Sequence, residues 1–84
     1  MLKVLFFART REELACSGLE LDWPDTRLDL YTLQEQLCVE HGQSWRDILT
    51  QDNMIRAVNQ KVVADNCELN DGDEIAFFPP VTGG

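Results

Sequence analysis

The sequence predicts an α+β roll, in which one main helix packs against one face of a mixed β-sheet. This fold class rests on the order of the segments along the chain. Two β-rich segments come first, an amphipathic helical segment follows, and short apolar segments separated by turn residues close the chain. The last strand can then return parallel to the first, because a helix lies between the two halves of the sheet.

The composition fits one small globular domain. The chain has 84 residues, of which 44% are hydrophobic, enough to form a core. Its net charge of −8 argues against nucleic acid or an anionic membrane as a partner, but would suit a partner with a basic docking surface. No segment approaches the length of a membrane span, and residues 1–8 contain Lys3 and lead into Arg9 rather than a signal-peptide cleavage site. We therefore expect a cytoplasmic protein.

The cysteines and the acidic loop do not indicate a metal site. Cys16, Cys38 and Cys67 are odd in number and widely spaced, which favours reduced thiols over zinc ligands or disulfides, and Cys38 occupies an apolar helical position expected in the core. In the loop 65–73, an EF-hand alignment on its glycine would place apolar or sulfur side chains where oxygen ligands are needed. His41, near a helix end, is expected to be a surface residue.

The first two strands are predicted as a wide hairpin. Residues 2–8 are rich in β-forming side chains, and both of their alternating faces carry large apolar groups, which favours a central strand. Residues 9–16 can hold a helical turn before Ser17 and Gly18 break it. Residues 19–23 alternate strictly between apolar and polar side chains and form the second strand, which ends at Pro24.

The main helix is predicted from a capping pattern and an apolar stripe. Thr32 and Glu35 have the spacing of a capping box, so we expect the helix to begin at Thr32 and to end at Gly42. The stripe consists of Leu33, Leu37 and Cys38. A second short helical segment is expected over residues 44–49, with Trp45, Ile48 and Leu49 facing the core.

Short strands and turns complete the predicted fold. Residues 55–63 read as two strands around a tight turn at Asn59 and Gln60, because asparagine tolerates a positive φ. Residues 65–73 are expected to form a polar loop, with a turn at 70–72. Residues 75–78 form the final strand.

A short C-terminal arm is predicted after a domain spanning residues 1–78. In this arm, residues 79–84, Pro79 and Pro80 end strand pairing and keep the chain extended, and Val81 and Thr82 are stiff. Gly83 and Gly84 have no side chain, so they could pass through a channel too narrow for other residues. Chemistry at the Gly84 carboxylate would require activation, for instance as an acyl adenylate. The alternative is an inert, frayed end.

Strand alternation predicts an apolar patch at the foot of this arm. If Phe6 and Phe77 face the helix, then Phe7 and Phe78 lie together on the opposite face of the sheet. Val62, Val63 or Leu5 could extend the patch. Exposed aromatic side chains beside a projecting arm indicate a docking surface, unless loops cover them.

Several of these segments resemble one known family. Residues 71–84, 4–8 and 57–60, together with Arg11 and Glu12, closely resemble the small, sulfur-carrying subunit of molybdopterin synthase, the MoaD family. The similarity runs the full length of the chain, is tightest at both ends and is loose over residues 17–53. It implies a ubiquitin-like β-grasp roll, with a mixed sheet packed against one main helix and a projecting Gly-Gly tail.

The resemblance also implies a function as a sulfur carrier rather than as an enzyme. An E1-like adenylating enzyme would consume ATP to activate Gly84, and a sulfurtransferase or cysteine desulfurase system would convert it to a thiocarboxylate. The carrier would then donate sulfur to cyclic pyranopterin monophosphate, in molybdenum cofactor biosynthesis, within a heterotetramer formed with the large synthase subunit. The resemblance implies that no cofactor is bound permanently.

Residue roles follow from the resemblance at matched positions. It implies that Gly84 is the modified residue and that the residues which enter the partner are Pro79, Pro80, Val81, Thr82 and Gly83. The implied docking residues are Phe7, Val62, Phe78 and Arg11. Two alternatives remain: a carrier for thiazole synthesis or a ubiquitin-like protein modifier with the same Gly-Gly terminus, against which residues 77–82 argue, and an interaction domain whose terminus is inert.

Overall fold

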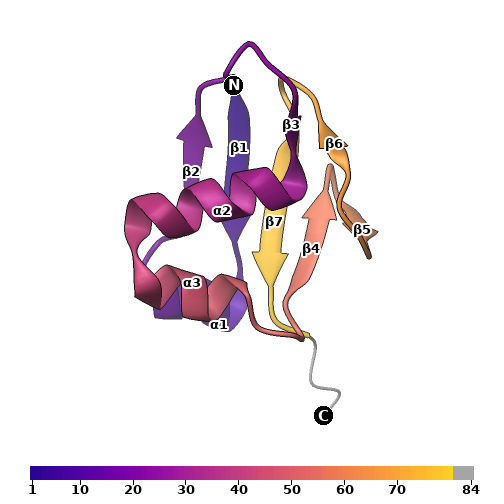
Figure 1. Ribbon diagram of the computed structural model, residues 1–84. Helices are drawn as coiled ribbons and strands as arrows, with labels where there is room; N and C mark the ends of the chain where they lie inside the picture. Colours follow the sequence, from indigo (N-terminus) through magenta and orange to yellow (C-terminus); the bar gives the residue numbers. More distant parts are fainter. Residues whose placement is uncertain (81–84) are drawn as a thin grey trace.

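One mixed sheet carries a helical layer on one of its faces, as the order of the segments predicts (Figure 1). The computed structural model describes residues 1–80. Its elements are β1 (Leu2–Phe6), α1 (Ala8–Leu14), β2 (Gly18–Leu21), β3 (Leu28–Asp29), α2 (Leu30–His41), α3 (Gln43–Leu49), β4 (Ile55–Val58), β5 (Lys61–Val63), β6 (Glu68–Leu69) and β7 (Glu74–Phe78). Helix α2 crosses β1 and β7, and α3 lies beside it toward the end where β7 finishes (Figure 1).

The final strand lies at the centre of the sheet. The strand order is β2-β1-β7-β4-β5. β1 pairs antiparallel with β2, which confirms the predicted hairpin, and parallel with β7, with Phe6 in register with Phe77. β4 pairs antiparallel with both β7 and β5. Because β7 has a neighbour on each side, the point where the chain leaves it is held by two strands.

The core lies between the sheet and the helices. The side chains of β1 and β7 that face α2 are almost fully buried, and the Phe6 and Phe77 rings stack with their centroids 5.8 Å apart. Trp45 of α3 packs edge-on against Phe6, at 5.3 Å, and stacks on the exposed His41 at 3.8 Å. Cys38 is buried as predicted, and this burial raises the pKa of its thiol.

The first strand is shorter than predicted. β1 ends at Phe6, and Ala8, with φ of 54°, begins a helix of seven residues. The predicted helical turn after the strand is therefore confirmed and starts one residue earlier. β2 ends at Leu21 rather than Trp23, because Trp23 leaves the strand and packs against the edge of the core.

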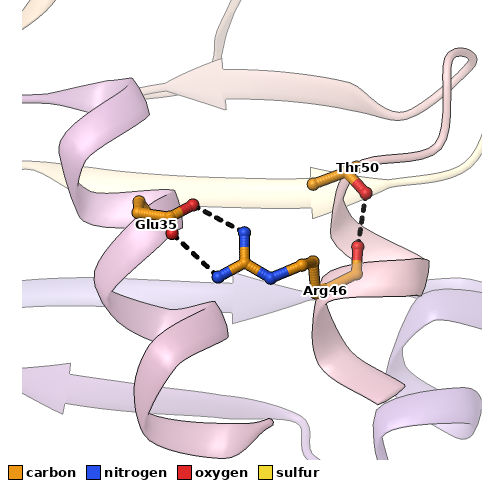
Figure 2. A network of polar contacts seen from close by, with 3 residues as sticks. All are labelled: Glu35, Arg46 and Thr50. Carbon is orange, nitrogen blue, oxygen red and sulfur yellow. Dashed lines mark hydrogen bonds and ion pairs between the residues drawn. The ribbon is translucent and has the colours of Figure 1, made fainter. Parts of the chain in front are cut away.

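The predicted capping box is wrong. The N-cap of α2 is Asp29, whose carboxylate accepts a hydrogen bond of 2.7 Å from the N–H of Thr32, so the helix begins at Leu30. Glu35 does not cap the helix, because both of its oxygens accept hydrogen bonds of 2.8 Å from Arg46 of α3 (Figure 2). The Arg46 carbonyl in turn accepts a hydrogen bond from the Thr50 hydroxyl (Figure 2). The predicted end of the helix at Gly42 is confirmed, and Gly42 has a φ of 97°.

A small second sheet was not predicted. β3 and β6 have two residues each and pair antiparallel, with Leu28 opposite Leu69. The sequence predicted a polar loop over residues 65–73. It did not show β6, because a two-residue strand is too short to show alternation. Leu28 and Leu69 are both buried, so this pairing closes one end of the core.

The turn at Asn59 and Gln60 is confirmed, and it links two distant parts of the chain. Both residues have positive φ values, 51° and 69°. The Asn59 side chain donates to a carboxylate oxygen of Asp73 at 2.9 Å and accepts from the Glu74 N–H at 3.0 Å. Its backbone N–H donates to the Glu74 carbonyl. These bonds anchor the β4–β5 turn to the start of β7, so two of the segments that carry the family resemblance are in contact.

Candidate docking surface

The sheet face opposite α2, here called the open face, carries one continuous row of small and apolar residues. The register aligns residues in the order Gly18, Leu5, Ala76, Ala57 and Val62, from β2 across to β5. Paired residues in adjacent strands point to the same side of a sheet, so this row lies on one face. The row contains no charged side chain, in keeping with the depletion of charged residues at the centre of protein interfaces, and its middle residues Ala76 and Ala57 are buried.

A second row lies closer to the end of β7 and carries aromatic side chains. Ile55 pairs with Phe78, and the Phe7 N–H donates to the Phe77 carbonyl at 3.2 Å, which brings Phe7 next to Phe78. Phe7 is 46% exposed, and Phe78 and Ile55 are partly exposed. The structure therefore places Phe7 and Phe78 together at the base of the arm, as strand alternation predicts. Their part in docking stays a prediction.

The residues suggested as extensions of the patch divide between the two faces. Val62 and Leu5 belong to the open face, and Val62 is 68% exposed. Val63 was considered as an extension, but it pairs with Arg56 on the helix side and packs against the core. The adjacent residues of one strand point to opposite faces, so only one of the two valines can join the patch.

Arg11 lies on α1, one helical turn after Phe7, and is exposed. Within residues 1–80 it has no ion-pair partner, whereas its neighbour Arg9 pairs with Glu13. Arg11 is therefore available for a partner's carboxylate close to the aromatic row. Its contact with a partner remains a prediction.

The arm begins directly at this surface. Pro79 and Pro80 follow Phe78 without strand pairing and are partly exposed. The other predicted arm residues, Val81, Thr82, Gly83 and Gly84, lie outside the described residues. The proposed modification at Gly84 and the entry role of Gly83 therefore stay predictions.

The carboxylates with a clearly lowered pKa are Asp29, held by hydrogen bonds from Thr32, and Glu35, held by Arg46, and both belong to the helical side of the molecule. Among residues 1–80, no group of three or more His, Cys, Asp or Glu side chains is arranged to hold a metal ion. Within the same residues, no helix is both long and apolar enough to cross a membrane.

Sequence reasoning missed the contributions of Ile55 and Gly18 to this face. Ile55 was assigned to a strand, but its position opposite Phe78 depends on the register between β4 and β7. Gly18 was predicted only to end the helical turn, whereas it is also the first residue of β2 and pairs with Leu5. The alternation of residues 19–23 predicted a strand, but it could not predict which residues of β1 each of them lies opposite.

Solved structures define the class of protein to which this fold belongs. The fold matches small archaeal modifier protein 1 of Haloferax volcanii with a TM-score of 0.78, at 20% identity, over 95% of this chain and 97% of that chain. It also matches a structure of the complex of subunits 1 and 2 of the molybdopterin-converting factor from Helicobacter pylori, with a TM-score of 0.65, at 23% identity, over 99% and 97% of the two chains. The class is that of ubiquitin-like β-grasp proteins, which confirms the fold implied by the resemblance.

Sequence comparisons place the chain more narrowly. The model of the ThiS family matches residues 4–84. The molybdopterin synthase sulfur carrier subunits of Escherichia coli and Haemophilus influenzae are 40% and 39% identical to it, and each alignment covers 100% of both chains. The chain therefore belongs to the ThiS family, among the molybdopterin synthase sulfur carrier subunits.

Proposed function

We propose that this chain is the sulfur carrier subunit of a molybdopterin synthase. Its Gly84 carboxyl group is adenylated, converted to a thiocarboxylate and then used to donate sulfur to cyclic pyranopterin monophosphate. The thiocarboxylate sulfur bonds to the pterin in place of an oxygen substituent, which gives a thioester, and water then cleaves the C–S bond to Gly84, so that the sulfur stays on the pterin and the carboxylate is restored. The proposal is supported by the similarity to sulfur carrier subunits over the full length of the chain and of those relatives.

The observation that carries the proposal is that the arm begins at the end of the central strand of the sheet. β7 is the central strand, held on one side by β1 and on the other by β4, and Pro79 and Pro80 leave it beside the partly exposed Phe78. A carrier that inserts its end into another protein needs such a fixed starting point, because each disordered residue would cost entropy on binding. A surface patch next to the arm then orients the insertion.

The chain acts as a reagent, and its partners supply the catalysis. The partners are the large synthase subunit, which forms a heterotetramer with it, an E1-like adenylating enzyme that consumes ATP, and a sulfurtransferase or cysteine desulfurase system. It binds no cofactor permanently and works in the cytoplasm. The name of the Helicobacter pylori structure, a complex of subunits 1 and 2, supports the large subunit as a partner.

The docking surface in this proposal is the aromatic row with its exposed neighbours. Phe7 and Phe78 contribute apolar area at the base of the arm, Val62 extends this area across β5, and Arg11 pairs with a partner carboxylate. Proline residues 79 and 80 and residues 81–83 enter the partner with Gly84.

A matched pair of valines tests the docking surface. Val62 on the open face is 68% exposed and Val39 on the outer face of α2 is 70% exposed, so both tolerate a charged side chain without loss of the core. We expect Val62→Asp to weaken binding of the large subunit about tenfold or more, measured by titration calorimetry, because a carboxylate would be buried in an apolar contact. Val39→Asp should bind as the wild type does. Equal effects of the two substitutions would contradict the assignment of the docking face.

The carrier chemistry is tested by intact mass. Incubation with ATP, the E1-like enzyme and a sulfur donor should add the mass difference between sulfur and oxygen, mapped to Gly84. A variant that lacks Gly84 should show no gain and should melt at the wild-type temperature, since the buried residues among residues 1–80 lie between Leu2 and Phe77. An unmodified wild-type chain, with the activating enzyme proven on a control substrate, would overturn the proposal. Covalent attachment to protein lysines instead of thiocarboxylate would favour the modifier alternative.

A further inference from the structure

Helix α1 is bounded at both ends by alanines with a strained backbone. Ala8, its first residue, has a φ of 54°, and Ala15, its C-cap, has a φ of 53°. At a positive φ the Cβ of an alanine lies too close to a carbonyl oxygen, which costs energy that a glycine would not incur. Strain of this kind persists where the surrounding structure holds it, and it is concentrated at functional sites.

The turn at Ala8 links the end of β1 to the first turn of α1. The Phe7 N–H donates to the Phe77 carbonyl at 3.2 Å, and the Phe7 carbonyl accepts from the Arg11 N–H at 3.4 Å. Because β1 and β7 run parallel with Phe6 opposite Phe77, an extended residue 8 would carry the chain on alongside Pro79. The positive φ of Ala8 instead turns the chain into the helix at once, so the bond between Arg11 and Phe7 can form.

Burial on the inner side of α1 leaves Arg11 on its outer side. Thr10 and Leu14, one helical turn apart, are buried, and the Thr10 hydroxyl donates to the Met54 sulfur at 3.9 Å. Arg11 is exposed. Helix α1 lies at the end of the sheet where β7 finishes (Figure 1). The helix therefore presents a cation at the end of the molecule where the arm begins.

We propose that Ala8 is a positioning residue of the docking surface. Its left-handed backbone holds Arg11 in a fixed position relative to Phe7, so that the cation meets a carboxylate of the large synthase subunit while the ring packs beside the arm. The inference rests on the proposed function and adds a residue to the predicted docking set. Alanine suits this role better than glycine, because glycine also adopts negative φ values and would let α1 change direction. Ala15 turns the chain toward β2 and has no such role.

A matched pair of glycine substitutions provides the first test. Each substitution relieves the strain of one alanine and adds freedom to the unfolded chain, and these opposing effects should keep the melting temperature within a few degrees of the wild type. Ala8→Gly should weaken binding of the purified large subunit about threefold, measured by titration calorimetry, whereas Ala15→Gly should bind as the wild type does. Normal binding by Ala8→Gly, or an equal loss in both variants, would overturn the inference.

A double-mutant cycle shows whether Ala8 acts through Arg11. Arg11→Ala removes the exposed cation and should weaken binding about fivefold. In that background Ala8→Gly should have no further effect, because no charge remains to be positioned. The same threefold loss in both backgrounds would show that Ala8 acts by another route, and the inference would fail.

Amide hydrogen exchange tests the claim in the free protein. The Arg11 N–H should exchange faster in Ala8→Gly than in the wild type, because its bond to the Phe7 carbonyl depends on the direction of the chain at residue 8. Ala8→Asn should exchange at the wild-type rate, since asparagine tolerates a positive φ without the freedom of glycine. An unchanged rate in Ala8→Gly would contradict the role of Ala8.

Two variants that leave Ala8 intact separate failure of this inference from failure of the proposed function. If Arg11→Ala and Phe7→Ala both weaken binding while Ala8→Gly binds normally, the docking surface stands and only the role of Ala8 is overturned. If neither of the two weakens binding, the docking surface itself is wrong, and the role of Ala8 fails with it. Failure of the carrier chemistry appears separately, in the intact mass of the wild-type chain.

Discussion

Arg56 shows how much one side chain can contribute to the position of the arm. Its guanidinium donates to the Leu49 carbonyl at 2.9 Å and to the Met54 carbonyl at 3.3 Å, and its Nε donates to the Gln34 side chain. Its guanidinium carbon also lies 6.0 Å from the centroid of the Phe77 ring. One residue thus connects α2, α3 and the β4–β7 pair directly behind the base of the arm.

We expect Arg56→Met to lower the free energy of unfolding by about 2–3 kcal/mol, because the partly buried Leu49 carbonyl would lose a charged donor. Urea unfolding measures this change. Arg46→Met is the matched control, since the exposed pair of Arg46 with Glu35 should contribute less (Figure 2). Equal losses in the two variants would contradict the stabilising role that we assign to the hydrogen bonds of Arg56.

The carboxylate of Asp29 makes part of the stability depend on pH. Hydrogen bonding from Thr32, through its side chain and then through its N–H, holds the pKa of Asp29 below its ordinary value. A group whose pKa is lower in the folded state stabilises the fold above its unfolded pKa and loses this effect as the pH falls through the folded pKa. The contribution should therefore be complete at neutral pH and decline below about pH 4.

Asp29→Asn tests this prediction, because asparagine is also a good N-cap but does not titrate. The variant should lose less stability than the wild type between neutral pH and about pH 3, measured by thermal unfolding across a pH series. Glu35, whose pKa is lowered by Arg46, should leave a residual acid sensitivity in the variant. Parallel curves for the two proteins would show that Asp29 contributes nothing to the pH dependence.

At the scale of elements, the β4–β5 turn holds the start of β7 in place through hydrogen bonds. Asn59 combines a left-handed backbone with two side-chain hydrogen bonds to the start of β7, at Asp73 and Glu74. Asn59→Ala should lower the free energy of unfolding by about 1–3 kcal/mol, because the Glu74 N–H loses its acceptor and alanine is strained at positive φ. Asn70→Ala, in the neighbouring turn, should have little effect, since within the described part of the chain only the Asn70 backbone takes part in hydrogen bonds. Amide hydrogen exchange at Glu74 would report the same loss locally.

The accuracy of the prediction from sequence also differs from one element to the next. The hairpin, the two helices and the turn at Asn59 follow from patterns that lie within a few residues, and the structure confirms them. The N-terminus of α2 was mispredicted at Thr32, because the residue that caps the helix is Asp29, three residues earlier. Asp29 became the cap because its pairing with Glu68 in the small sheet ends the strand there.

At the scale of the whole molecule, the charge should guide assembly. With 15 acidic and 7 basic residues, the chain should be attracted to a basic surface of the large subunit. We expect the association rate to fall as the salt concentration rises, while the dissociation rate changes little. Stopped-flow fluorescence measures both rates. An association rate that is independent of salt would show that the net charge serves another purpose, such as solubility.

The sequence alone determined the features that depend on local chemistry. Alternation within residues 2–8 and 75–78 assigns Phe7 and Phe78 to one face, and Pro79 and Pro80 end the last strand because they lack an N–H. Only the tertiary structure decided which residues meet across strands: the row from Gly18 to Val62, the place of Ile55 beside Phe78, and the inward position of Val63. Register is set by pairings between segments far apart in the chain, and a shift of one residue would turn every side chain of a strand to the other face.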